Sequence, residues 1–486
     1  MFTNTQGVVM DPMIIMEEHK KIRYADSLPM TENEKIADNF LQELKARENE
    51  YFVDENFRLT KNNIKKSPLV SILKAMPKGA LLHTHFWPHS KRTMFEMFDT
   101  FDNLCINIGE AHGDVIKYQF MYTHEPESFN KDGVLFKNIK QLTLNSRYKD
   151  EFYESIYSSL QFYTPNIKVS SSNMWHHFDD IAFRVISLVQ YVPAYEYYVF
   201  NTLEKYLDDG IYHVEMRWIG GLYDENGPYD YRYVVDFTNE IVEKFNKKHN
   251  ANLSIVFIYT TLKKNAREDV FKEMVNVVNW RENGYRDSIV GFDMVDSEEL
   301  YYGYDYYKPI IQQINTYTSQ NGYEPLPLLL HAGETSLNDS IGSENLFHAI
   351  ACGCERISHG IIINNYPILK TIAKENNICF DICPISNQLL RFTPSMKTHP
   401  SKILFSENIP LTISNDDSCI YGYNSIAYDF YYIIKAWNLT LRDVKKLCFN
   451  SIKYSKSTPQ NKNMMFKRFN SEWNIWVERV CEAYKK

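Results

Sequence analysis

The chain of 486 residues lacks several features that would place it in a broad class of protein. No run of apolar residues approaches the roughly 18 that a membrane-spanning helix needs, so the sequence predicts no membrane span. Eight cysteines are too few for a disulfide scaffold. The close pairs, Cys352 with Cys354 and Cys379 with Cys383, lack the spacing of a zinc ribbon. We therefore expect buried free thiols.

Strong charge of either sign is also missing. The chain has 53 Lys+Arg and 61 Asp+Glu, a formal net charge of −8, which argues against nucleic acid as a partner. The stretch from Met1 to Lys21 has no basic segment followed by an apolar one, so it does not resemble a signal peptide. This pattern predicts a cytoplasmic protein, unless a leader has been removed. With 44% hydrophobic residues, the chain can bury a large core and is not intrinsically disordered.

The N-terminal region begins with one clear helical pattern. Glu32 to Lys45 carries apolar residues at three-to-four-residue spacing, and Thr31 with Glu34 has the pattern of a capping box. After this helix the sequence to Ser67 is polar, and we expect irregular structure there. We assign residues 1–75 to a helical arm that lies on the main body or on a second subunit, where it could serve in dimerisation.

From Gly79 onward, short apolar runs recur and end in polar or ionisable residues. The expected strands are Ala80–Leu82, Ile211–Arg217, Leu253–Tyr259, Ser288–Phe292, Leu326–Leu330, Arg356–Ser358, Ile378–Ile382 and Ile409–Ile413. Helical patterns lie between most of them, such as Val270–Trp280, Tyr306–Tyr317 and Ser343–Ala351. Eight nearly continuous apolar strands alternating with helices are typical of a (β/α)8 TIM barrel, an α/β fold.

We place this barrel at residues 76–486, with its chemistry at the C-terminal ends of the strands. The stretch between the first predicted strand and Ile211 is far longer than one helix needs. We therefore expect an inserted subdomain at about residues 100–169, in which Cys105 is the only cysteine.

Histidines and an aspartate follow four of the predicted strands. His83 and His85 come directly after the first, and alternation in an extended segment sends both imidazoles to the same side. Such a pair alone is more often an accident of packing, but His331, His359 and Asp416 end the fifth, sixth and eighth runs. Three neutral imidazoles and one carboxylate suit zinc, with a position left for water. We assign one Zn²⁺ per chain to His83, His85, His331 and Asp416.

Further ionisable residues adjoin these ligands. Glu334 lies three residues beyond His331, and its carboxyl group can protonate a substrate ring nitrogen while hydroxide from zinc-bound water adds. His359 is left to deprotonate this water or to stabilise the oxygen that adds. Asp417 points away from Asp416 if the backbone is extended, and it could then accept a hydrogen bond from a departing amine or a ring nitrogen. Alone, the Asp-Asp pair would indicate a turn or helix cap.

A centre with two metal ions is the alternative for a barrel hydrolase. Such centres use a bridging lysine or glutamate at the end of the fourth strand, whereas the fourth predicted strand here ends in Phe292 and Asp293. A single metal ion is the simpler hypothesis.

Together, these motifs resemble the adenosine deaminase family, most closely its adenosine-deaminase-related growth factor branch. The similar segments occur in the expected order over most of the chain from about Ser67. They are Met76–His85, His331–Thr335, Arg356–Gly360, Cys383–Gln388 and Ser414–Asp417. The resemblance implies zinc-dependent hydrolytic deamination of adenosine or 2′-deoxyadenosine to inosine or deoxyinosine and ammonia. It also implies a homodimer formed through the N-terminal arm, an inserted domain, and an extracellular location if a leader was removed.

The resemblance also implies residue roles. It matches His83, His85, His331 and Asp416 to the zinc ligands. It makes Glu334 the proton donor to purine N1, His359 the general base and Asp417 the contact to N7. Trp175 corresponds to a position near the ribose.

Three departures from the family pattern leave the substrate open. Phe86 stands where relatives carry an aspartate that touches the ribose, and Asp296 stands where they have a glycine whose N–H meets purine N3. Cys105 has no partner within the insertion, so the disulfide of extracellular members cannot form there. The alternatives are an aminohydrolase of another purine or nucleoside, and a catalytically weak growth-factor-like protein. We expect His176 and His177 to serve in packing or to lie at the surface.

Overall fold

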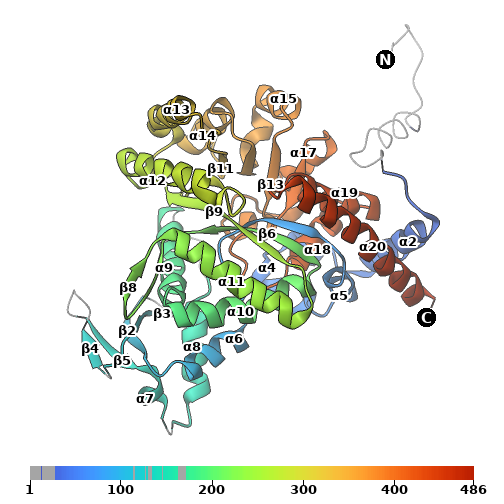
Figure 1. The fold of residues 1–486 in the computed structure, drawn as a ribbon. Coiled ribbons are helices and arrows are strands. Elements are labelled where there is room, and N and C mark those ends of the chain that lie inside the picture. Colours follow the sequence, from blue (N-terminus) through green and yellow to red (C-terminus); the bar gives the residue numbers. More distant parts are fainter. Residues whose placement is uncertain are drawn as a thin grey trace.

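The computed structural model describes residue 13 and residues 28–112, 115–125, 127–129, 134–144, 146–162 and 171–485. At its centre lie eight parallel strands, and all eight predicted strands are confirmed (Figure 1). They are β1 (Gly79–Thr84), β6 (Ile211–Trp218), β9 (Ser254–Leu262), β10 (Ile289–Val295), β11 (Leu329–Ala332), β12 (Arg356–His359), β13 (Cys379–Ile382) and β14 (Leu411–Ile413).

The strands close into a barrel through two short junctions. Hydrogen bonds join them in the orders β1-β6-β9-β10 and β11-β12-β13-β14. At one junction the N–H of Phe292 donates to the Pro327 carbonyl at 2.9 Å. At the other, the N–H of Asp416 donates to the His83 carbonyl at 3.3 Å, in a parallel bridge beside Thr84. This second junction brings two predicted metal ligands from opposite ends of the barrel sequence to neighbouring positions.

Helices surround the barrel and cover its outer face (Figure 1). Between and after the strands lie α10 (Val192–Asp208), α11 (Tyr231–His249), α12 (Arg267–Trp280), η1 (Arg281–Tyr285), α13 (Tyr304–Asn321), α14 (Ile341–Ala351), η2 (Ile361–Asn365), α15 (Pro367–Glu375), α16 (Pro384–Leu389), η3 (Met396–Thr398), α17 (Ser401–Ser406), α18 (Ala427–Ala436) and α19 (Leu441–Lys453). The three predicted helical patterns fall within α12, α13 and α14. A short hairpin, β7 (Leu222–Asp224) and β8 (Gly227–Tyr229), follows β6.

The N-terminal region packs against the C-terminal helix. Helix α2 (Glu32–Arg47) begins with the predicted capping box, in which the Glu34 N–H donates to the Thr31 hydroxyl and the Thr31 N–H donates to the Glu34 carboxylate. It lies along α20 (Pro459–Tyr484), and the indole N–H of Trp473 donates to Glu34 at 2.8 Å (Figure 1).

The prediction of irregular structure up to Ser67 is wrong. That stretch forms α3 (Tyr51–Asp54) and α4 (Phe57–Ile64), and α5 (Pro68–Lys74) follows. The Asn56 side chain caps α4 by accepting from the Arg58 N–H, and Phe57, Thr60 and Ile64 form a buried face. This short helix contains so few apolar residues that their spacing gives no clear helical pattern.

Between β1 and β6 stands a small antiparallel sheet, set apart from the barrel in Figure 1. Its strands β2 (Leu104–His112), β3 (Val115–Tyr122), β4 (Glu127–Phe129) and β5 (Leu135–Asn138) pair in the order β3-β2-β5-β4. Helices α6 (Lys91–Thr100), α7 (Ile139–Thr143), α8 (Lys149–Ser159) and α9 (Ser171–Val189) accompany it. The domain boundaries proposed for the arm and the insertion stay predictions.

Two composition-based expectations can be compared with the structure. All eight cysteines are free, and seven of them are buried, Cys352 being half-buried. None of the helices in the described ranges is long and apolar enough to cross a membrane.

Candidate metal centre and active site

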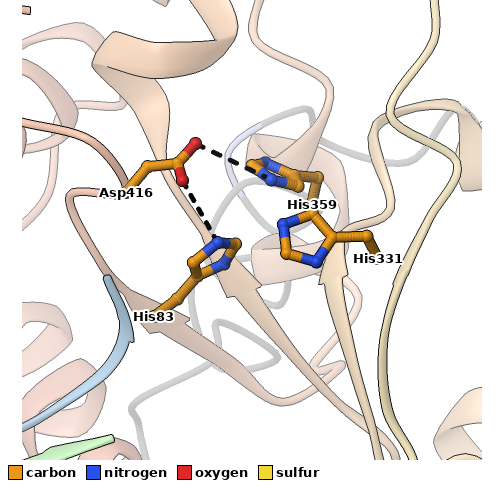
Figure 2. A group of neighbouring side chains, drawn as sticks. All are labelled: His83, His331, His359 and Asp416. Carbon is orange, nitrogen blue, oxygen red and sulfur yellow. Dashed lines mark ion pairs between the residues drawn. The ribbon is translucent and has the colours of Figure 1, made fainter. Parts of the chain in front are cut away.

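Three of the predicted ligands and His359, the predicted general base, converge at the C-terminal ends of the strands. His83 lies in β1, His331 in β11, His359 at the end of β12 and Asp416 after β14. Figure 2 shows these four side chains pointing toward one another. Each offers a ligand atom, and these atoms all lie within 4.8 Å of one another. His85, Asp416 and Asp417 form a second such group, which shares Asp416 with the first.

The spacing of three of these atoms matches a tetrahedral ion. His83 Nε2 lies 3.1 Å from His85 Nε2 and 3.2 Å from Asp416 Oδ1, and His85 Nε2 lies 3.3 Å from the same oxygen. Ligands 2.0–2.1 Å from a tetrahedral zinc ion are separated from one another by about 3.3 Å. His359 Nε2 lies farther from Asp416, at 3.9 Å from Oδ2. These residues therefore fit a tetrahedral zinc ion. The distances favour His85 over His359 as a ligand.

Carboxylates lie behind two of these histidines. Asp381 Oδ1 is 2.6 Å from His83 Nδ1, and Asp293 Oδ2 is 2.7 Å from His331 Nδ1. A carboxylate only accepts, so Nδ1 carries the proton in both rings and the Nε2 lone pair faces the centre. Asp293, at the end of the fourth strand, thus contacts the candidate ligand His331.

Below the centre, two arginines pair with three carboxylates in a set that we call the ion-pair layer: Glu215, Arg217, Asp293, Arg356 and Asp381. Arg217 Nε donates to Asp293 at 2.7 Å, and Arg356 donates to Asp381 at 2.9 Å and to Glu215 at 2.6 Å. All five side chains are buried. The sequence interpretation missed this layer, although Asp381 interrupts a predicted apolar strand and Asp293 ends one.

Three acids at the centre, Glu334, Asp416 and Asp417, have displaced pKa values. We call these three residues the catalytic layer. Burial, and then the charge of Asp416, raises the pKa of Glu334 well above its usual range. The same two causes raise the pKa of Asp417. Burial opposes the ionisation of Asp416, but His83 and His85 lower its pKa well below the usual value. Burial thus favours the protonated forms of Glu334 and Asp417, whereas the neighbouring histidines favour the ionised form of Asp416.

One pocket collects the remaining candidates. Phe86, Trp175, Asp296 and Asp417 all line it, together with Glu334 and three of the histidines. Asp179, from α9, also lines the pocket, and Lys264 Nζ lies 3.6 Å from Asp179 and 3.3 Å from Asp296. His176 is exposed and His177 half-buried, and neither lines this pocket.

The backbone around the pocket departs from extended geometry. Asp416 has a φ of +53°, so the backbone is not extended there, contrary to the assumption behind the expected orientation of Asp417. Asp417 consequently lines the same pocket as Asp416. Asp296, with a φ of +97°, has the conformation that favours glycine. Such residues often cluster at functional sites.

Comparisons with known proteins agree with this geometry. The family model described as adenosine deaminase matches residues 142–471. The chain belongs to the adenosine deaminase family. A similar relative is adenosine deaminase 2 of Dictyostelium discoideum, which is 28% identical over 97% of this chain and 87% of its own length. As a member of this family, the protein is a hydrolase that deaminates purines, and the family depends on a metal ion.

Solved structures show the same fold as this deaminase. Arabidopsis ADAL complexed with IMP is 14% identical, with a TM-score of 0.57 over 83% of this chain and 98% of its own. An amidohydrolase from Burkholderia ambifaria with bound Zn is also 14% identical, with a TM-score of 0.56 over 85% of this chain and 94% of its own. The barrel assigned to the deaminase from its sequence is thus confirmed.

Proposed function

We propose that this protein catalyses zinc-dependent hydrolytic deamination of adenosine or 2′-deoxyadenosine, giving inosine or deoxyinosine and ammonia. The observation that carries the proposal is the position of Glu334. Its carboxyl group, whose pKa is raised by burial, lies in one pocket with the candidate ligands His85, His331 and Asp416.

His83, His85, His331 and Asp416 would hold the zinc ion. The tetrahedral spacing and the lone pairs fixed by Asp293 and Asp381 support this assignment. Bound zinc supplies hydroxide from water at neutral pH. The Burkholderia amidohydrolase, which shares the fold, contains Zn.

The two neutral acids fit the nitrogens of a purine ring. Protonated Glu334 can give its proton to N1 as the C6 carbon is attacked, and a positioned acid contributes about 10²–10⁴-fold in rate. Protonated Asp417 can donate a hydrogen bond to N7, which only accepts. This role differs from the accepting role expected from the sequence, because burial and the charge of Asp416 raise the pKa of Asp417 and so favour its protonated form.

The pocket favours a neutral nucleoside over a nucleotide. Asp179 and Asp296 line it, and Lys264 is the cation paired with both. Two carboxylates against one ammonium repel a phosphate group. Trp175 and Phe86 offer aromatic surface to the sugar or base. Because Phe86 stands where relatives carry an aspartate, one hydrogen bond to the sugar is not made. Dimer formation and the compartment stay predictions.

The decisive experiment follows the conversion of adenosine to inosine by purified protein whose metal content has been measured. Glu334→Gln should keep zinc and lose about 10²–10⁴-fold in kcat. Glu344→Gln, a matched change on the exposed side of α14, should leave both unchanged. A loss of only a few-fold in Glu334→Gln would contradict its role as proton donor.

The substrate is tested with deoxyadenosine, adenine, AMP and N6-methylated analogues. Adenosine and deoxyadenosine should react fastest, and AMP should be poor because of Asp179 and Asp296. Faster turnover of another purine would support the alternative aminohydrolase. Inactivity on all of them by zinc-loaded protein would contradict both and favour a non-catalytic growth-factor-like role.

A further inference from the structure

His359 has a different partner at Nδ1 from the other buried histidines of the centre. His83 and His331 face carboxylates there, whereas His359 Nδ1 lies 3.0 Å from Nδ2 of Asn387. The Asn387 side chain is fully buried. An asparagine can present either a donor or an acceptor, so this contact by itself does not locate the ring proton.

The orientation of the Asn387 amide follows from a second histidine. His399 is buried, and its Nδ1 accepts a hydrogen bond from the backbone N–H of Ser401 at 3.2 Å. A backbone N–H only donates, so His399 Nδ1 must carry the lone pair. Burial lowers the pKa of His399 to about 3, so the ring is neutral and its proton lies on Nε2.

That proton orients the amide. His399 Nε2 lies 3.2 Å from Asn387 Oδ1, which must accept, so the amide NH₂ group faces His359 and donates to Nδ1. The backbone of Asn387 is held as well, since its N–H donates to the Cys383 carbonyl and its carbonyl accepts from Phe392. The series of hydrogen bonds from the Ser401 N–H through His399 to Asn387 therefore has one consistent arrangement of donors and acceptors.

We propose that Asn387 and His399 are positioning residues that fix the ring proton of His359 on Nε2, so that His359 acts at the centre as a hydrogen-bond donor. The catalytic part of this inference rests on the proposed deamination. The location of the proton does not.

The geometry at Nε2 agrees with a donor. His359 Nε2 is buried, makes no hydrogen bond to the described residues, and lies 3.4 Å from Glu334 Oε1 and 3.9 Å from Asp416 Oδ2. With a proton on Nε2, the ring offers no lone pair to a metal ion. Of the two roles open from the sequence, this arrangement selects stabilisation of the oxygen that adds to the purine, without transfer of the His359 proton.

The proton can be located directly by NMR of zinc-containing protein labelled with 15N-histidine. The His359 signals are assigned by their loss in His359→Gln. We expect Nδ1 of His359 to have the 15N shift of an unprotonated nitrogen and Nε2 that of a protonated one. The reverse pattern, or two protonated nitrogens, would overturn the proposal whether or not the protein deaminates adenosine.

Asn387→Asp offers the sharpest change, since it replaces the donor with an acceptor of the same shape. The His359 proton should then move to Nδ1, and kcat should fall about 10–100-fold with KM changed only a few-fold. Asn246→Asp is the matched control, because the Asn246 amide in α11 also both donates and accepts, to the Leu253 carbonyl at 2.8 Å and from the Leu253 N–H at 3.0 Å, outside this hydrogen-bonded set. It should keep both the tautomer and kcat. Equal behaviour of the two variants would reduce Asn387 to a structural role.

A second pair of variants keeps the test valid if Asn387→Asp does not fold. His399→Gln retains an N–H donor near the position of Nε2, whereas His399→Leu has none. His399→Gln should keep the His359 tautomer, and His399→Leu should give mixed tautomers and a lower kcat. If the tautomer is unchanged in His399→Leu, the anchoring chain proposed here is wrong.

Discussion

The barrel interior contains two layers of carboxylates that differ in their partners. In the ion-pair layer, arginines contact every carboxylate: burial opposes ionisation, yet Arg356 lowers the pKa of Glu215 to about 2, and His331 and Arg217 lower that of Asp293. In the catalytic layer, directly above, burial and Asp416 raise the pKa values of Glu334 and Asp417.

The difference shows how one fold keeps acids in opposite protonation states. The lower carboxylates stay ionised, and they hold the Nδ1 protons of His83 and His331. Of the upper acids, Glu334 is only partly influenced by Lys263, and burial together with Asp416 raises the pKa values of Glu334 and Asp417, which favours forms that can donate a proton. Changes to the two layers should therefore affect stability and activity in different proportions.

The largest effect is expected at the metal centre. His83→Ala removes one of four ligands, so bound zinc and deaminase activity should fall together, with activity lost by several orders of magnitude. Metal analysis and inosine formation are measured on the same samples. His176→Ala, an exposed histidine outside the centre, should change neither. Full zinc content in His83→Ala would contradict its assignment as a ligand.

Asp381→Asn tests the ion-pair layer. It leaves Arg356 and Arg217 with less negative charge, and removing one partner of a buried ion pair typically costs about 3 kcal/mol of unfolding free energy. Because the folded pKa of Asp381 is lowered, its contribution is present above pH about 4 and declines as the pH falls further. Urea unfolding of the parent protein and the variant at several pH values measures this contribution to the unfolding free energy. Zinc affinity should also fall about 10–100-fold, since His83 loses its carboxylate. Equal stability at pH 7 would show that the layer is not needed for folding.

Asp296→Gly tests the strained backbone at the pocket. Glycine should relieve the φ of +97° and raise the unfolding free energy by about 1 kcal/mol, after the entropy of glycine in the unfolded chain is subtracted. It also removes a carboxylate from the pocket, so KM for adenosine should fall. Asp339→Gly, at another positive φ on the exposed surface, should leave KM unchanged. A higher KM in Asp296→Gly would indicate that the carboxylate binds substrate.

The smallest effect is expected from Asp179→Asn, with a sign opposite to that of Asp381→Asn. Burial and Asp296 raise the pKa of Asp179 to about 6, so the folded protein binds this proton more tightly than the unfolded chain. The ionised form thus costs stability, which is lost as the pH rises from about 4 through 6.

At pH 7 the Asp179→Asn variant should be more stable than the parent protein by less than about 1 kcal/mol, given solvent screening. The difference should vanish near pH 4. Thermal melts across this pH range measure it, and a variant that is less stable at pH 7 would show that the ion pair with Lys264 outweighs burial.

The sequence predicted the repeating elements well because they depend on local patterns. The eight apolar runs fixed the strands, and the Thr31–Glu34 spacing fixed the start of α2. Features that depend on polar residues were harder to predict from the sequence. Helix α4 was missed because its cap and three buried residues are spread through a polar stretch, and the ion-pair layer was missed because its members come from four different strands.

By itself, the sequence determined the barrel, the strand ends that carry the candidate ligands and the acid at Glu334, because strand alternation and strand order place such residues on one face. Only the tertiary structure decided their chemical states. Whether an acid is ionised depends on burial and on charges brought from distant strands, as Asp416 and Glu334 show. Likewise, the proton position on His359 depends on Asn387, His399 and the Ser401 backbone, which meet only when the chain is folded.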